Sequence, residues 1–395
     1  MLVILLYLNL IGMKSYNDSI HNIVYNTDAS HLLQNVSTEV FIPENKDEVI
    51  DIVKKAISEN KKVICRWWWT NLVWNCLPED NYYVIDLSRL NSILRIWENS
   101  VVVQPWITND QLNEKLSEKW LIFPVVLWSH AWAEIWWMIA TNWAWMRAIK
   151  YWKMEERVEE LEVLYVDKEK TVKVERLAKE ELKDFLWAEW KIWIVLESKL
   201  KIIPIPWKIS VDFKSFSTSK EALDYVKEIK NQSIKELSAL EIINPQVAWY
   251  LGLENKYYVL AEYEDINEWS IKDENEIRDI REKRDACYAV SINAWYDQIE
   301  DPQISLDKAE EFFARFESNQ IPIFWHIWIW VLHPHFKSSQ KELVKEMYEL
   351  VNRLWWKVSW EHWIGKKKEE YLSDDIKTKN KWIKDKRDPN NIFWF

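Results

Sequence analysis

The chain has 395 residues, with 63 acidic against 52 basic side chains and a formal net charge of −11. Its 48% hydrophobic and 29% charged residues exclude a disordered, a collagen-like or a disulfide-rich chain. The acidic balance argues against a nucleic-acid-binding surface. The unusual feature is 30 tryptophans against 3 glycines, because average usage would give about 7% glycine.

Residues 1–35 form an N-terminal segment before the first expected domain. Residues 1–12 are apolar, but they lack a basic stretch and are too short to span a bilayer. We interpret them as an over-extended gene start before Met13, with a membrane-associating tail as the alternative. Three cysteines without a CxxC spacing indicate a reducing compartment. We therefore expect a cytoplasmic protein, with a peripheral position at the inner face of the membrane as the alternative.

Short strands and helices alternate between residues 36 and 205. Apolar residues at helical spacing after Pro43 predict the first helix of this region. Strands are expected at 63–65, 82–87, 101–104, 161–166 and 171–174. The IIPIP run at 202–206 predicts a domain boundary, and helices follow near 220–230 and 306–317.

Many tryptophans occupy positions that ordinarily require glycine. Thr108 and Gln111 form a capping box, and the helix they begin ends at Lys119. Trp120 therefore stands where a left-handed residue is expected. The three rings of 67–69 have no credible packing after the strand at 63–65, whereas three glycines would form a phosphate-binding turn. Our hypothesis is that most tryptophans are glycines in the native protein, through a UGA codon reassigned to glycine. A truly tryptophan-rich protein is the alternative, and Trp97 and Trp382 are the positions least expected to be glycine.

With tryptophan read as glycine, residues 65–74, 128–145 and 185–197 become glycine-rich segments. In this order they resemble the FAD-linked oxidase family, whose FAD domain is of the vanillyl-alcohol-oxidase type. The resemblance is strongest to the branch of the glycolate oxidase subunit and the D-lactate and D-2-hydroxyglutarate dehydrogenases. It implies an α+β fold with a two-lobed FAD-binding domain at 36–206 and an α+β substrate cap at 207–330. Residues 331–395 would then complete the active site.

The glycine-rich segments are suited to FAD because backbone N–H groups can approach its pyrophosphate closely there. Side chains such as Thr70 and Ser129 can add hydrogen bonds. The resemblance implies the following cofactor-binding residues: Arg66, Trp67, Trp68, Trp69, Thr70, Asn71, Leu72, Pro105, Trp128, Ser129, Ile135, Trp136, Trp137, Asn142, Trp145, Tyr151, Glu189, Trp190, Ile192 and Ile194.

Two C-terminal motifs resemble the metal and base motifs of the same family. Residues 324–334 resemble F-G-H-x-G-D-G-N-L-H-P, and residues 359–365 resemble S-G-E-H-G-I-G. The resemblance implies His326, His333 and Glu361 as ligands of Zn²⁺, Mn²⁺ or Fe²⁺ and His362 as the catalytic base. A degenerate site with structural histidines is the alternative, because the family's Asp and Asn are Ile329 and Val331 here. We expect His21, His31, His130 and His335 to be structural.

Arg281 and Arg284 resemble the arginine-bearing helix that meets the substrate carboxylate in this family. The guanidinium fork binds a carboxylate through two hydrogen bonds. The alternative is that both arginines are charges on a solvated helix face. Residues 300–303 resemble the family's E-D-x-x-V-P motif.

The resemblance implies FAD-dependent oxidation of a 2-hydroxy acid, such as D-lactate, glycolate or D-2-hydroxyglutarate, to the 2-oxo acid. Flavin N5 would accept the hydride. The alternative is a non-catalytic flavin-binding subunit of a larger redox complex. A third alternative is an ether-lipid-type or aldonolactone-type enzyme on the same FAD domain, against which the E-H-x-I-G motif at 361–365 argues. The sequence leaves the electron acceptor open among a quinone, a flavoprotein, a cytochrome and oxygen, and we expect no nucleic-acid partner. Association with a membrane or with a redox subunit is a further expectation.

Overall fold

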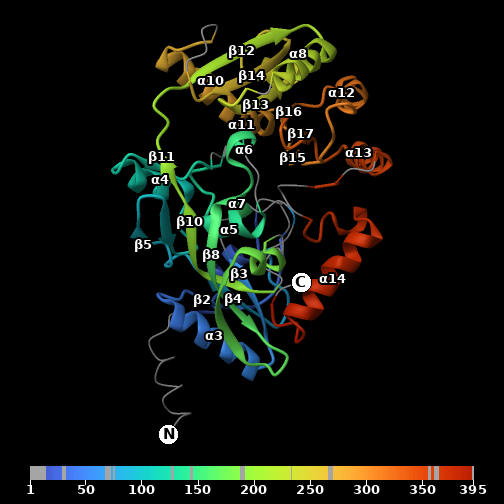
Figure 1. The fold of residues 1–395 in the computed structure, drawn as a ribbon. Coiled ribbons are helices and arrows are strands. Elements are labelled where there is room, and N and C mark those ends of the chain that lie inside the picture. The colour runs from blue at the N-terminus through green and yellow to red at the C-terminus, as the bar shows by residue number, and fades with distance from the viewer. Residues whose placement is uncertain are drawn as a thin grey trace.

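The computed structural model describes residues 15–28, 33–66, 73, 76–125, 129–142, 146–186, 192–232, 234–265, 270–354, 357–359 and 364–393. These residues form a mixed α+β structure, which confirms the predicted fold class. In Figure 1 the cap sheet and its helices lie at one end of the molecule, and the first lobe of the predicted FAD-binding domain lies at the other. No helix in these ranges is both long enough and apolar enough to cross a membrane.

The first lobe is a four-stranded sheet in the order β1-β2-β4-β3, in which β2, β4 and β3 are parallel. Helix α3 begins after Asn45, whose side chain accepts the N–H of Glu48, and it buries its apolar side against the core. The elements are β1 (Ser15–Tyr16), α2 (Ser19–Tyr25), β2 (Glu39–Phe41), α3 (Lys46–Ser58), β3 (Lys62–Arg66) and β4 (Tyr82–Asp86).

The second lobe is a five-stranded antiparallel sheet in the order β5-β6-β10-β8-β9. Its strands are β5 (Ile93–Ile96), β6 (Ser100–Val103), β8 (Val158–Val166), β9 (Val172–Ala178) and β10 (Ile194–Lys201). A separate pair, β7 (Leu121–Ile122) and β11 (Ile203–Pro204), lies beside it. Its helices are α4 (Asn109–Ser117), α5 (Ile135–Ala140), α6 (Ala148–Tyr151), α7 (Met154–Arg157) and the 3₁₀ helix η1 (Lys179–Asp184). The predicted capping box of Thr108 and Gln111 is confirmed.

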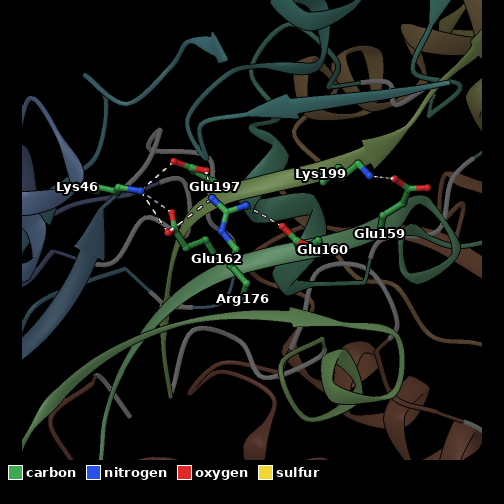
Figure 2. A network of polar contacts seen from close by, with 7 residues as sticks. All are labelled: Lys46, Glu159, Glu160, Glu162, Arg176, Glu197 and Lys199. Atoms are coloured by element: carbon green, nitrogen blue, oxygen red, sulfur yellow. Dashed lines mark hydrogen bonds and ion pairs between the residues drawn. The ribbon is translucent and has the colours of Figure 1, made fainter. Parts of the chain in front are cut away.

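A network of ion pairs joins the two lobes. Lys46, at the start of α3, lies 3.0 Å from Glu162 of β8 and 3.1 Å from Glu197 of β10. Arg176 of β9 binds Glu197 and Glu160 on the same sheet face (Figure 2). The hydrogen bond to Glu162 is the main reason that the pKa of Lys46 is raised, so this amine stays charged. One charged side chain of the first lobe is therefore held by two strands of the second.

The cap is a six-stranded antiparallel sheet in the order β12-β14-β13-β16-β17-β15. Its strands are β12 (Ser210–Phe216), β13 (Leu237–Ile243), β14 (Tyr257–Tyr263), β15 (Gln298–Ile299), β16 (Ile323–His326) and β17 (Val331–Phe336). Its helices are α8 (Ser219–Asn231), α9 (Pro245–Tyr250), α10 (Glu274–Asp285), α11 (Cys287–Asn293), α12 (Ala309–Glu317) and α13 (Lys341–Arg353). The β16–β17 hairpin and α13 carry this sheet and its core past residue 330, where we expected the cap to end.

The C-terminal segment returns to the first lobe. After the 3₁₀ helix η2 (Glu369–Tyr371), helix α14 (Asp374–Arg387) runs beside the lobes in Figure 1. The amide of Val63 in β3 then donates to the carbonyl of Ile392 over 2.8 Å. Ile392 and Phe393 join the hydrophobic core that the two lobes share. The last described residues thus belong to the predicted FAD-binding domain.

Candidate functional site

Strand β3 leads directly into the first predicted phosphate turn. Its last residue, Arg66, is buried, and its Nη atoms donate to the carbonyls of Tyr25 and Cys76 among others. This side chain therefore ties the end of the strand to neighbouring backbone. Ten predicted FAD residues lie outside the described residues: Trp67, Trp68, Trp69, Thr70, Asn71, Leu72, Trp128, Trp145, Glu189 and Trp190.

The second predicted turn is fixed by backbone hydrogen bonds at the start of α5. The N–H of Ile135 donates to the carbonyl of Ile107, and the N–H of Trp136 donates to the carbonyl of Pro105, each over 3.0 Å. Cys65 of β3 and Ile135 of α5 belong to the same hydrophobic core. Both predicted phosphate turns therefore start from one core, which fits a cofactor held between the two lobes.

The remaining predicted FAD residues in the described ranges serve the protein's own structure. The carbonyl of Ser129 accepts the N–H groups of Trp132 and Ala133. Asn142 has a φ of 45° and exchanges two hydrogen bonds of 2.8 Å with Glu155. The Tyr151 hydroxyl donates to Glu264. Ile192 and Ile194 are buried in the core of the FAD-binding domain, and the half-buried Trp137 packs against it. Their contacts with FAD stay predictions.

The backbone at several tryptophans is of the kind that glycine adopts. The predicted left-handed position of Trp120 is confirmed by a φ of 59°. Trp152 has φ 63° and ψ −160°, a region that is essentially limited to glycine. Trp295 and Trp330 also have positive φ, at 67° and 62°. These four positions show the geometry that the glycine hypothesis expects.

One face of the cap sheet carries a row of polar side chains. Glu241 of β13 lies opposite His326 of β16, and Glu262 of β14 lies opposite Ala239, two residues from Glu241. Since cross-strand partners and residues two apart share a face, these three side chains lie on the same face. The other face is apolar and packs against α8, α12 and α13.

Helix α10 places the two predicted substrate arginines over this polar face. Arg281 and Arg284 are one helical turn apart, and each reaches a different glutamate. Arg284 donates to Glu241 from Nε over 2.7 Å and from Nη2 over 3.1 Å, and its Nη1 donates to Asp285. All three nitrogens of Arg284 are thus used within the protein, and the sequence did not reveal their main partner, Glu241.

Glu241 also fixes the orientation of His326. The His326 Nδ1 lies 2.5 Å from Glu241 Oε1, and both side chains are buried. Burial alone would raise the pKa of Glu241, but the charges of Arg284 and His326 outweigh it and hold that pKa well below its usual range. The ionised carboxylate orients the imidazole through Nδ1, which leaves Nε2 as the ligand atom.

The structure brings the two predicted metal-binding histidines together. The ring centroids of His326 and His333 are 4.9 Å apart, and His333 stacks on Phe324 at 4.6 Å. Burial, followed by the charge of His326, lowers the pKa of His333 well below its usual value. A neutral imidazole is the form that binds a divalent metal. The structure thus brings together the two imidazoles of the predicted ligand set, and the metal itself stays a prediction.

The other two residues predicted for this site, Glu361 and His362, lie outside the described residues. Within the described residues, no group of three His, Cys, Asp or Glu could hold a metal ion. His335 is buried beside Phe324 and Tyr288, and His130 pairs with Asp110 at the surface over 2.6 Å. Both of these contacts agree with the structural roles expected for His130 and His335.

Ile329 and Val331 stand where the motif that residues 324–334 resemble has Asp and Asn. Both are buried and form a small cluster with Ala148 of α6. The substitution therefore has a packing partner in the FAD-binding domain. The cluster also joins α6 to the loop between His326 and His333.

A second buried network lies where the chain enters the last predicted motif. Lys368 binds Asp301 and donates to Ser359 Oγ over 3.1 Å, and Ser359 donates to Asp301 over 2.7 Å. Lys368 also lies 3.2 Å from Glu300, which accepts the Tyr348 hydroxyl. The sequence pointed to residues 300–303, but Lys368 is hidden in a run of three lysines that resembles a solvated surface.

Comparison with known proteins agrees with this architecture. Residues 38–175 match the family model described as an FAD binding domain. Two structures of alkyldihydroxyacetonephosphate synthase share the fold, each at 13% identity. One has a TM-score of 0.68 over 96% of this chain and 81% of the other, and the second has 0.71 over 98% and 84%. No curated protein matches the sequence significantly. Residues 38–175 thus carry an FAD-binding domain, and the chain shares the fold of these synthase structures over nearly its full length.

Proposed function

We propose that this flavoprotein is an FAD-linked oxidoreductase that oxidises a 2-hydroxy acid to the 2-oxo acid. The observation that carries the proposal is the polar face of the cap sheet. It brings His326 and His333 together beneath a helix that carries two arginines. An alcohol next to a carboxylate needs a group that binds the anion and groups that activate the hydroxyl, and this face offers arginine and imidazole side chains.

The chain's own residues would divide this work. His326, His333 and Glu361 would hold a divalent metal, which would lower the pKa of the substrate hydroxyl. His362 would accept the hydroxyl proton, Arg281 would bind the carboxylate, and the cap would exclude water. FAD, when bound, supplies the hydride acceptor.

A non-catalytic flavin subunit is the second candidate. It is favoured by Ile329 and Val331, which are apolar, lie between the two histidines in the sequence and pack against Ala148. Such a protein would hold FAD without turning over a hydroxy acid.

Anaerobic bleaching of the flavin separates the two candidates. A panel of D- and L-2-hydroxy acids is added to the FAD-loaded protein, and flavin absorbance is followed. We expect D-lactate, glycolate or D-2-hydroxyglutarate to bleach it. His362→Ala should slow bleaching by roughly 10²–10⁴-fold, the scale for losing a general base, and should retain FAD. If dithionite reduces the flavin and no hydroxy acid does, the flavin-subunit function is the better account.

A further inference from the structure

Arg147 is a buried arginine whose hydrogen-bonding capacity is only partly used. It lies directly before α6, in the FAD-binding domain, and its side chain is 6% exposed. Its Nε donates to Glu262 Oε1 over 2.8 Å. Across the ranges that the structure describes, neither Nη atom has a hydrogen-bond partner. Within the described residues the guanidinium thus makes one of its five possible hydrogen bonds.

Arg281 meets the same carboxylate from the opposite side. Its Nε donates to Glu262 Oε2 over 2.9 Å, its Nη2 donates to that oxygen as well, and its Nη1 has no partner within the described ranges. Glu262 thus receives one guanidinium from each domain. Arg284 differs, because all three of its nitrogens are used by Glu241 and Asp285.

The charges around Glu262 do not balance. The buried Arg147 and the one-third-exposed Arg281 contribute +2, and Glu262 contributes −1, so the local balance is +1. Arg284 does not add to this excess, because Glu241 and Asp285 offset its charge, and the nearby Glu264 pairs with Lys150. An unbalanced positive charge with unused N–H groups is suited to an anion.

The position of Arg147 relates this charge to the two histidines. Its neighbour Ala148 packs against Ile329 and Val331, which lie between His326 and His333 in the sequence. Glu262 shares the sheet face with Glu241 and His326. The two partly used arginines and the histidine pair therefore belong to one polar face, closed on one side by α6.

We propose that the unused N–H groups of Arg147 and Arg281 together form the anion site of this protein, which binds a carboxylate beside Glu262. The inference rests on the proposed function and deepens it. The FAD-binding domain supplies one arm of the substrate site, and the cap supplies the other. Arg284 then positions Glu241 and His326 and does not bind substrate.

The test is a titration of the FAD-loaded protein with oxalate, a two-carbon dicarboxylate. Changes in the flavin absorbance spectrum report the binding. Arg147→Met should weaken oxalate binding by roughly 10- to 100-fold, the loss expected for a charge-assisted contact. Arg147→Lys keeps the charge without the guanidinium fork, so its affinity for oxalate should lie between those of Arg147→Met and the wild type. It takes the place of Arg147→Met in the titration if that variant does not fold. Arg157→Met, a half-buried arginine in the adjacent α7, is the matched control and should bind oxalate as the wild type does.

A double variant separates an anion site from a purely structural pair. Arg147→Met with Glu262→Gln restores the +1 charge through Arg281, so oxalate binding should partly recover. Wild-type affinity in Arg147→Met, or no recovery in the double variant, would overturn the inference. Since oxalate binding needs no turnover, Arg147-dependent binding in a protein that no hydroxy acid reduces would contradict the proposed function alone. Bleaching by a hydroxy acid that is unaffected in Arg147→Met would contradict the inference alone.

Discussion

Lys368 binds Ser359 through its side chain: its Nζ donates to Ser359 Oγ over 3.1 Å. The backbone N–H of Lys368 donates to the carbonyl of Ile364. Between these two contacts the sequence carries Glu361 and His362, the predicted ligand and base. Lys368 is fully buried and binds Asp301 and Glu300. The ammonium group of Lys368 therefore holds Ser359 against the cap, and the backbone N–H of the same residue holds Ile364.

Replacing Lys368 with methionine should destabilise the protein strongly. Asp301 and Glu300 would lose a buried cation, and breaking a buried ion pair typically costs about 3–5 kcal/mol. Urea unfolding followed by circular dichroism measures the effect. Lys381→Met is the control: it removes an exposed lysine that pairs with Asp385 on α14, so the urea midpoint of unfolding should not change. Equal midpoints for the two variants would contradict the anchoring role.

The contact between the two lobes should affect how firmly FAD is held. Lys46→Met removes the amine that binds Glu162 and Glu197, so the lobes should separate more readily. We expect FAD to dissociate roughly threefold faster at low salt, the scale of a partly exposed ion pair, and the difference should shrink at high salt. Stopped-flow flavin fluorescence measures the rate. Lys54→Met, on the same helix, is the control, because Lys54 pairs only with Asp51 of α3. A rate that is raised equally at all salt concentrations would argue against an ionic contact.

The sequence predicted the parts of this molecule that depend on local patterns. The capping box at Thr108 and the left-handed position of Trp120 follow from a few neighbouring residues, and the structure confirms both. The pairing of His326 with His333 followed from a motif, because a short hairpin brings its two ends together. Glu241 and Arg147 could not be predicted in this way. Their partners are 43 to 115 residues away and are chosen by the register of β13 and β14 and by the contact between two domains.

Glycine should replace tryptophan at most of the unusual positions in native material. Trp193 and Trp325 are fully buried, and their indole N–H groups have no partner within the described ranges. Trp152 has a backbone conformation that glycine alone adopts readily. Peptide mass spectrometry should therefore find glycine masses at 67–69 and at 152, 193 and 325. Protein made with glycine there should purify with FAD bound, and protein made with tryptophan should be colourless. Tryptophan masses at 67–69 in native protein would refute the hypothesis.

The histidine pair should bind metal independently of the flavin. His326→Ala, His333→Ala and Glu361→Ala should each lose about one divalent ion per chain, because two imidazoles and a carboxylate form the predicted ligand set. FAD should remain bound, since these residues are not in the predicted phosphate turns. Elemental analysis and the flavin spectrum together measure both properties. His130→Ala, at the surface, is the control and should keep the metal. Active wild-type protein without metal would instead favour a metal-free oxidase, in which Ile329 and Val331 have closed the site.

Glu300 should make the stability of the protein depend on acidic pH. Burial would raise its pKa, but the charges of Lys367 and Lys368 outweigh it and lower the pKa to about 2. The pKa of an ordinary glutamate is about 4.3, so as the pH falls this carboxylate is protonated in the unfolded chain before it is protonated in the folded protein. The stabilisation by the ionised carboxylate is therefore complete above about pH 5 and is lost as the pH falls towards 2. Glu300→Gln keeps an acceptor for the Tyr348 hydroxyl but cannot titrate, so its urea midpoint should be lower at pH 7 and should fall less steeply between pH 5 and 2. Parallel pH profiles for the variant and the wild type would show that Glu300 is not ionised in the folded protein.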